Sequence, residues 1–498
     1  MRNSNCASTR FFHISVFGLS LLLSGCVMGP DYEEAKPVSP QSWALWNSSN
    51  NQYNLLLSEH DIQTNWWEAF NDPVLNRLQQ RAIQNSPDLQ TAALQFAQAR
   101  AQRIGINAQS LPQVNLSAGV SRQRQSEYGA GTRTFEALSG DRSTLAEVLG
   151  RPFTLYQTGL DASWELDLWG RVSRSIEVAD ANIAQQAALL DYARLSLLSE
   201  VARNYLELRT LQQQVVLYEK DIVALESLTG ITEQRVKSGV AEALNLNLNL
   251  AELAALKANL PPLQAQIHTL KNSLALLLGE LPGKLHEELT EQTSIPSNPL
   301  PELALGLPSQ VVNRRPDIRA AEHQLHAATA NIGVATANLY PSISLGAAFG
   351  FESYLAGELA DWGSRSWSIG PVLNLPLFDH GRLKSRVQLR ELEQQQAAVN
   401  FHQTVLKAWK EVDDTLFGYA SIKQKEHELH VREENAFNHY NLVQSRYQAG
   451  LENFSAVLMS ERQYLQARMA SNENRGQLYT QYVMINKAIG NGPDNLSL

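Results

Sequence analysis

Cys26 is the residue whose surroundings indicate a defined reaction. It follows Leu23-Ser24-Gly25, so small residues stand directly before a cysteine. Two arginines and a short apolar stretch, residues 14–23, precede this motif and are typical of an export signal rather than of a spanning helix. We therefore predict that residues 1–25 are removed and that Cys26 becomes lipidated, with N-acyl and diacylglycerol chains. The alternative is an ordinary cleaved signal followed by a chance cysteine.

Other side chains with chemical potential lack the partners that a site needs. His323 and His326, and likewise His427 and His430, stand three residues apart and could share a helix face and bind a metal. Two histidines on an exposed helix are more often solvated, and no third ligand is evident. The neighbours Asp413-Asp414 would point to different helix faces. We expect no enzyme activity, no metal and no cofactor beyond the lipid.

Composition excludes several classes of protein. The chain has 498 residues, of which 44% are hydrophobic, and its 41 Lys and Arg against 50 Asp and Glu give a net charge of −9. Nucleic-acid binding proteins normally carry a basic face, so no nucleic-acid partner is expected. Two cysteines, one of them in the signal, cannot form a disulfide framework within the mature chain.

An internal duplication organises the chain. Pro87-Asp88-Leu89 recurs as Pro316-Asp317-Ile318 at an offset of 229, and Gly170-Arg171 recurs as Gly381-Arg382 at an offset of 211. The offsets differ by 18, so the first copy has a longer loop between residues 121 and 158. Fixed offsets over such a distance indicate two copies of one structural unit.

Each copy contains a segment with alternating apolar and small polar residues, at about 112–168 and about 341–378. Strands of about ten residues with one apolar and one polar face are typical of transmembrane β-structure. A half-buried soluble hairpin fits the periodicity equally well, but the export signal and the lipidation motif favour the membrane. Tryptophans near the strand ends would suit an interfacial girdle; they are Trp164, Trp169, Trp362 and Trp367.

Long helices follow each hairpin. Proline is absent from 153–260, and the pattern predicts a helix over 171–237, about 100 Å long at 1.5 Å per residue. Gly239 and Gly450 mark tight reversals, and a returning helix is expected over 244–278. Helices of this length belong to a coiled-coil rod or tube. Pro87 is expected to break the helix that precedes the first hairpin.

Four transmembrane strands require partners. An open sheet edge in lipid leaves backbone groups unpaired, so the chains must associate, and cyclic symmetry is the usual solution. A dimer would give eight strands and a trimer twelve. The small residues on the polar face favour a wide pore and hence twelve strands.

Several motifs resemble TolC-like outer-membrane efflux factors, in the NodT/OprM-type lipoprotein branch. The motifs are Leu307–Glu322, Trp66–Pro73, Trp164–Arg171 and Leu276–Gly279. The resemblance implies an α+β fold, in which a trimeric, twelve-stranded β-barrel with four strands per chain continues into a periplasmic α-helical barrel, with a mixed equatorial domain. The segments expected on this basis are a signal (1–25), a lipidated arm (26–72), a first repeat (73–279), an equatorial linker (280–310), a second repeat (311–490) and a tail (491–498).

The resemblance also implies a function. Such proteins are homotrimeric, passive exit ducts of tripartite pumps in the Gram-negative outer membrane. They dock a periplasmic adaptor and an inner-membrane transporter, usually of the resistance-nodulation-division class, and export drugs, toxic compounds or metal ions. A duct for type I protein secretion is one alternative, and a structural coiled-coil lipoprotein is another. The paired amphipathic strands argue against the second alternative.

The helix reversals would form the periplasmic tip, where family members narrow to a gate and meet the adaptor. Aspartates often line that aperture, but this chain has Asn245 and Met459 there, with Glu242, Glu452 and Glu461 nearby. A polar and apolar constriction is the hypothesis for this chain; the alternative is that Met459 packs within the coiled coil. The predicted tip residues are Arg235, Gly239, Val240, Asn245, Arg446, Gly450, Leu451 and Met459.

Overall fold

The computed structural model describes residues 27–35, 57–58, 65–128, 150–290, 300, 303–304 and 308–492. These residues form two compact units, each assembled from separate segments of the chain. The sheet unit comprises the described residues within Met1–Glu33, Ala99–Ile183 and Gln324–Ala397, and the helical unit comprises those within Glu34–Gln98, Ala184–His323 and Ala398–Leu498. Cys26 lies outside the described residues.

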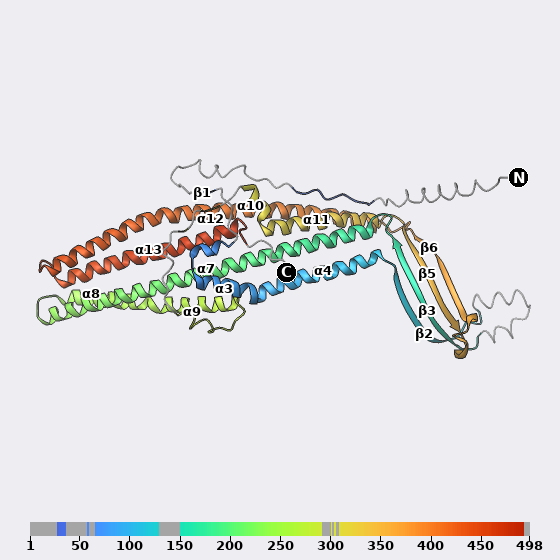
Figure 1. The fold of residues 1–498 in the computed structure, drawn as a ribbon, viewed down its shortest axis with the longest axis horizontal. Helices are drawn as coiled ribbons and strands as arrows, with labels where there is room; N and C mark the ends of the chain where they lie inside the picture. The colour runs from blue at the N-terminus through green and yellow to red at the C-terminus, as the bar shows by residue number, and fades with distance from the viewer. Residues whose placement is uncertain are drawn as a thin grey trace, which may run out of the picture. The chain divides into compact units, whose positions relative to one another are not determined.

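A four-stranded antiparallel sheet dominates the sheet unit (Figure 1). Its strands, in spatial order, are β2 (Gln113–Gln123), β3 (Phe153–Leu166), β5 (Ser342–Ser353) and β6 (Arg365–Asn374). One apolar row crosses all four strands through Leu116, Leu160, Phe349 and Trp367. The adjacent row consists of Ser117, Gly159, Gly350 and Ser366. The predicted alternation of an apolar and a small polar face is therefore confirmed.

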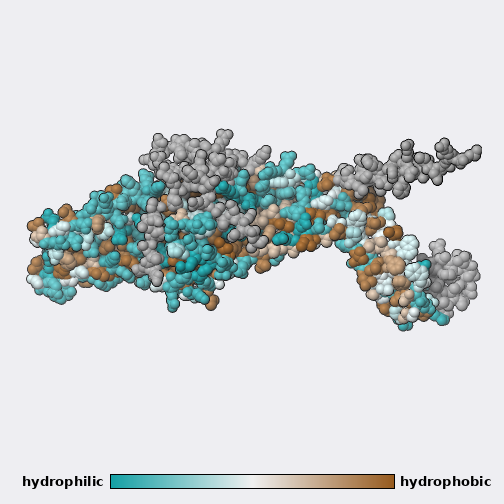
Figure 2. Space-filling model, viewed as in Figure 1, coloured by the Kyte–Doolittle hydropathy of each residue, from teal (hydrophilic) through white to brown (hydrophobic). Residues whose placement is uncertain are grey.

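The apolar face of this sheet is exposed in the single chain. Leu116 is 74% exposed and Ile369 is 66% exposed, and Figure 2 shows hydrophobic residues gathered over the strands. Among the described residues, β2 and β6 each pair along one side only. The sheet thus has two open edges and an uncovered apolar surface, which an isolated soluble domain rarely keeps.

Helices make up most of the rest of the described chain. Their bounds are α3 (Pro73–Asn85), α4 (Pro87–Asn107), α7 (Arg171–Lys237), α8 (Ala243–Ala258), α9 (Leu260–Leu277), α10 (Pro308–Arg314), α11 (Pro316–Ala337), α12 (Arg382–Gln448) and α13 (Phe454–Ala488). Short 3₁₀ turns occur at Trp66–Phe70, Ala108–Ser110, Ala356–Glu358 and Trp362–Ser364. Two short strands, β1 (Leu57–Ser58) and β4 (Leu303–Ala304), pair in parallel. No described helix is long and apolar enough to cross a membrane.

The duplication is visible in the helix bounds. α7 and α12 each contain 67 residues, and their first residues are separated by the offset of 211 found in the sequence. The predicted helix over 171–237 is confirmed, as is the break at Pro87, because α3 ends at Asn85 and α4 begins at Pro87. Asp72 caps α3 by accepting hydrogen bonds from Val74 N at 2.8 Å and Leu75 N at 3.2 Å.

One helix prediction was wrong. The returning helix expected over 244–278 consists of two helices, α8 and α9, which meet at Asn259. Pro261 and Pro262 follow directly, and a proline lacks the N–H that would continue the hydrogen-bond ladder. The matching helix of the second copy, α13, is continuous over 35 residues.

The largest core lies in the helical unit. Trp66 and Phe70, from the turn before α3, contact Tyr482 of α13 edge to face, with ring centroids 6.5 and 5.6 Å away. Tyr205 of α7 is fully buried and donates a hydrogen bond to Asp72 Oδ2 at 2.6 Å. The segment before α3 is thus anchored against the helices of both repeats.

Candidate functional site

The first helix reversal is a compact backbone turn after α7. Val240 N donates to Arg235 O at 2.9 Å, and Gly239 N donates to Val236 O at 3.0 Å. This pair of bonds defines a Schellman motif, which requires a left-handed residue at its end. Gly239 meets that requirement with φ of +72°. Val240 is 75% exposed, so the turn presents an apolar side chain to the surroundings.

The second reversal repeats the same turn after α12. Leu451 N donates to Arg446 O and Gly450 N donates to Tyr447 O, both at 2.9 Å, and Gly450 also has φ of +72°. The predicted glycines therefore occupy the reversal in both copies. Figure 2 shows hydrophobic residues among the hydrophilic ones at these helix ends. Val240, Leu244 and Leu451, at or next to the two reversals, are exposed.

Additional contacts stabilise the second reversal. Arg446 forms an ion pair with Glu452, at 3.3 Å between Nη2 and Oε1. The rings of Tyr447 and Phe454 lie 5.4 Å apart. Asn453 caps α13, because its Oδ1 accepts a hydrogen bond from Ala456 N at 3.0 Å.

The two predicted gate residues are at the surface of the chain. Asn245 is exposed in the first turn of α8, where its N–H donates to Glu242 O at 3.2 Å. Met459 lies on α13 and is 56% exposed. Neither side chain belongs to the buried core of the chain. Their roles as gate elements stay predictions.

An ion-pair cluster around the buried Asp221, which the sequence did not reveal, connects the helices of the two repeats. Arg462 of α13 binds Asp221 of α7 at 2.7 Å through Nε and Glu252 of α8 at 2.8 Å through Nη2. Burial raises the pKa of Asp221, which is 1% exposed, while the hydrogen bond from Arg462 lowers the pKa of Glu252. Asp221 resembles the many solvated carboxylates of α7, so only its burial distinguishes it.

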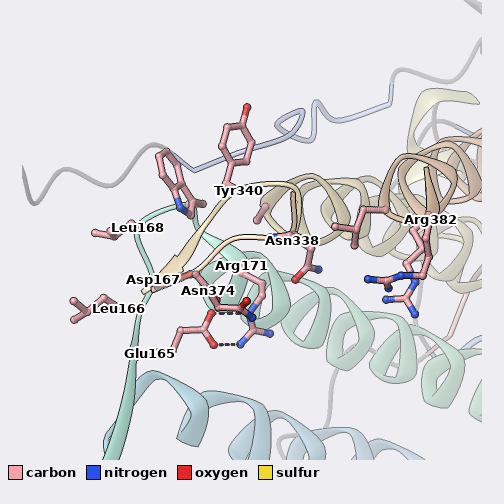
Figure 3. A pocket seen from close by; sticks show the side chains of 15 residues that line it. Glu165, Leu166, Asp167, Leu168, Arg171, Asn338, Tyr340, Asn374 and Arg382 are labelled. Carbon is pink, nitrogen blue, oxygen red and sulfur yellow. Dashed lines mark hydrogen bonds and ion pairs between the residues drawn. The ribbon is translucent and has the colours of Figure 1, made fainter. Parts of the chain in front are cut away.

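In the sheet unit, a cavity of about 360 Å³ lies where the strands meet the helices that follow them (Figure 3). Glu165 of β3 holds Arg171 of α7 in a bidentate pair, with both distances at 2.8 Å. That hydrogen bonding raises the pKa of Arg171. Asp167 caps α7 by accepting from Val172 N at 2.9 Å and Ser173 N at 2.7 Å. These contacts fix the junction from β3 to α7.

The residues that follow Cys26 are bound to the same unit. Arg174 binds Asp31 at 2.6 Å and Glu177 at 2.7 Å. His326, a candidate ligand in the sequence, instead lies 2.9 Å from Glu177 and stacks on Tyr32 with ring centroids 4.3 Å apart. The described ranges contain no group of three or more His, Cys, Asp or Glu that could hold a metal ion.

The predicted tryptophans divide between the two ends of the sheet. Trp164 and Trp169 lie at the end of β3, where Trp169 Nε1 donates to Pro341 O at 2.7 Å. Trp362 and Trp367 lie at the start of β6 and are 67% and 70% exposed. Their positions are compatible with two aromatic belts.

Comparison with known proteins identifies relatives over nearly the full length. The family model described as "Outer membrane efflux protein" matches residues 78–280 and 307–491. The toluene efflux pump outer membrane protein TtgF of Pseudomonas putida is 32% identical, over 97% of this chain and 98% of that protein. The cation efflux system protein CusC of Escherichia coli is 31% identical, over 80% of this chain and 81% of that protein. Among solved structures, the outer-membrane channel OprN has a TM-score of 0.80 at 28% identity, covering 94% of this chain and 99% of that one.

Proposed function

Because the chain belongs to the outer membrane efflux protein family, and is an outer-membrane efflux duct that extends into the periplasm, we propose that it works as a passive homotrimeric channel for small molecules. The observation that carries the proposal is the four-stranded sheet, with an exposed apolar face, a small polar face and two open edges. In lipid such edges must be paired, and another copy of the same sheet offers a complementary edge. Three copies provide twelve strands.

The polar face would then line the pore. Its rows contain serine and glycine, with Asn115 donating to Asp161 at 3.1 Å and Gln157 donating to Glu352 at 2.8 Å across neighbouring strands. A surface of small and hydrated side chains leaves a lumen instead of filling it. Transport through such a duct needs no chemistry of its own, and energy is supplied by the partners.

Lipidation of Cys26 is part of the proposal. The ion pair of Arg174 with Asp31 holds the adjacent arm on the sheet unit, which would place the lipid near the strands that enter the membrane. One or more acyl chains would add membrane affinity to that of the strands.

We further propose that both reversals dock a periplasmic adaptor, which connects the duct to an inner-membrane transporter, here of the resistance-nodulation-division class. The exposed Val240 and Leu451, with the charged side chains of Arg235, Arg446 and Glu452 beside them, provide an apolar and charged docking surface. TtgF and CusC are named for toluene and for cations, so one architecture serves different cargo, and we assign the choice of cargo mainly to the transporter.

A pair of neighbouring substitutions tests the orientation of the sheet. Ile369 faces the apolar side of β6 and Ser368 faces the polar side. Ile369→Lys should cost about 2–4 kcal/mol near the middle of the membrane, whereas Ser368→Lys should be tolerated in the lumen. Light scattering of the purified protein should give a three-chain mass for wild type and Ser368→Lys, with less folded trimer for Ile369→Lys. Equal tolerance of both lysines would contradict the proposed orientation.

Gene deletion separates small-molecule export from protein secretion. Deletion should lower resistance to toxic organic compounds or metal ions, and the wild-type gene should restore it. Unchanged resistance together with loss of one secreted protein would favour the type I secretion duct. Replacement of Cys26 by Ser, with mass spectrometry of the mature chain, tests lipidation independently.

A further inference from the structure

We propose that Arg382 and Arg386 form an anion-binding station in the cavity of the sheet unit, which contacts carboxylate or phosphate groups of the exported molecules. The inference rests on the proposed function, because it takes the polar face of the sheet as the face of the pore. The proposed substrates are organic anions, and Arg382 and Arg386 are the residues of this chain that would favour them.

The cavity opens on the polar side of the sheet. Its strand residues include Glu165, Ser342 and Asn374, and each belongs to the polar set of its strand. Figure 3 shows Glu165 turned toward Arg171, while Leu166 and Leu168 point away from this pair. An anion in the cavity would therefore lie on the side that faces the proposed lumen.

Among the described charged residues that line the cavity, all but Arg382 and Arg386 already have a local binding partner. Glu165 is paired with Arg171, and Asp167 accepts hydrogen bonds from the first N–H groups of α7. Asp379, which precedes α12, accepts from Gly381 N at 3.0 Å and from Leu383 N at 2.8 Å and so serves as the cap of that helix.

Arg382 and Arg386 line the cavity from the first two turns of α12. Within the described part of the chain, neither guanidinium has a carboxylate within ion-pair distance, although Asp379 adds a longer-range attraction to Arg382. Residues four apart share a helix face, and two like charges there destabilise the helix. A bound anion would remove that repulsion.

The chemistry of guanidinium defines the ligand. Its planar fork matches the two oxygens of a carboxylate or phosphate, and two such forks on one face can hold a single multivalent anion. A cavity of about 360 Å³ accommodates such a group with part of the molecule that bears it. Asn338 and Asn374, which also line the cavity, provide neutral hydrogen-bonding groups. Threefold symmetry would repeat the station around the pore and give the duct a preference for anions.

The test uses the purified full-length protein and citrate as the probe. Citrate binding is measured by calorimetry in detergent, and the reversal potential is measured in planar bilayers under a salt gradient. Arg382→Gln/Arg386→Gln should abolish citrate binding. It should also lower the anion-to-cation permeability ratio by a factor on the order of ten at low salt, since focused charge concentrates counter-ions to about that extent.

Lys384→Gln is the matched control, because Lys384 lies on the same turn of α12, is exposed and does not line the cavity. It should leave citrate binding and the permeability ratio near wild type. Citrate binding and ion preference that are unchanged in the double variant would overturn the proposal, and would indicate that a carboxylate of another copy neutralises the arginines. A wild-type protein that binds citrate through these arginines but forms no channel would contradict the proposed function instead.

Discussion

The two repeats use the same reversal but stabilise it differently. Gly239 and Gly450 have the same φ and the same pair of backbone hydrogen bonds. The second reversal adds the Arg446–Glu452 ion pair and the Asn453 cap, whereas Glu242, at the position before α8, provides no side-chain cap. The returning helix of the second repeat is continuous, while that of the first is interrupted at Asn259.

This difference shows which features a duplicated helical hairpin must keep. The left-handed glycine is retained because glycine adopts that backbone at lower cost than residues that carry a Cβ atom. Caps, ring contacts and exposed ion pairs contribute smaller amounts individually and have diverged. We therefore expect the first hairpin to depend more on contacts with the second, among which Arg462 binds both Asp221 of α7 and Glu252 of α8.

Removal of Arg462 should produce the largest difference in stability between the two hairpins. Arg462→Met leaves the buried carboxyl of Asp221 without its partner, which typically costs about 3–5 kcal/mol. Because Arg462 also binds Glu252, the loss should appear mainly in α7 and α8 of the first hairpin. Hydrogen exchange of the backbone amides, resolved by helix, measures it.

Lys257→Met is the control for that experiment. Lys257 pairs with Glu226 at 2.6 Å, but the two side chains are 50% and 47% exposed. An exposed pair of this kind contributes about 0–1 kcal/mol, so protection should hardly change. Equal losses in the two variants would show that the buried cluster does not hold the hairpins together.

The cluster of Asp221, Glu252 and Arg462 predicts that the stability of the fold depends on pH. Burial raises the pKa of Asp221, so its ionised form costs stability at neutral pH, and this cost is relieved as the pH falls through that pKa. Without Arg462 the pKa should rise further, so Arg462→Met should be less destabilising at pH 5 than at pH 7.5. Thermal unfolding at both pH values measures the difference.

Asp221→Asn combined with Arg462→Met provides the control, since an amide cannot titrate. Glu252 has the opposite sign: its pKa is lowered by Arg462, so its contribution is present above its unfolded pKa and is lost as the pH falls through the folded value. A destabilisation by Arg462→Met that stays the same between pH 7.5 and pH 5 would assign the effect to Glu252 instead of Asp221, because the contribution of Glu252 is lost only below its unfolded pKa of about 4.3.

The sequence predicted most of the architecture, because periodicity and repetition are local signals. The two-residue period defined the strands, and the long interval without proline defined α7 to its end residues. The expected helix over 244–278 overlooked the interruption at Asn259, although Pro261 and Pro262 mark it in the sequence, since proline is favoured in the first turn of a helix and here begins α9. The pattern of charges on α7 and α13 contained no signal for the pairing of Asp221 with Arg462, which are 241 residues apart.

The reversal glycines should have the next largest effect. Gly239→Ala and Gly450→Ala each place an L-residue in the left-handed region, which costs roughly 1–2 kcal/mol. Exchange should increase further into α8 for the first variant than into α13 for the second, because the second reversal keeps its other contacts. Gly230→Ala is the control: it lies within α7 with open space around it, and should instead stabilise the helix by about 0.5–1 kcal/mol. If amide exchange increased over equal lengths of α8 and α13 in the two variants, the proposed difference in stability between the hairpins would be contradicted.

The helix caps should have the smallest effect on the stability of the hairpins. This effect can be tested by removing the cap of α13 and by adding a cap to α8. Asn453 and Glu242 occupy matching positions, because 453 minus 242 is the repeat offset of 211. Asn453→Ala removes the hydrogen bond to Ala456 N and should cost about 1 kcal/mol at the start of α13. Glu242→Asn should provide the missing cap and increase protection in the first turn of α8 by a similar amount. If the asymmetry between the hairpins is local, the two substitutions together should make their amide exchange nearly equal. If the first hairpin stays less protected, the interruption at Asn259 is the cause.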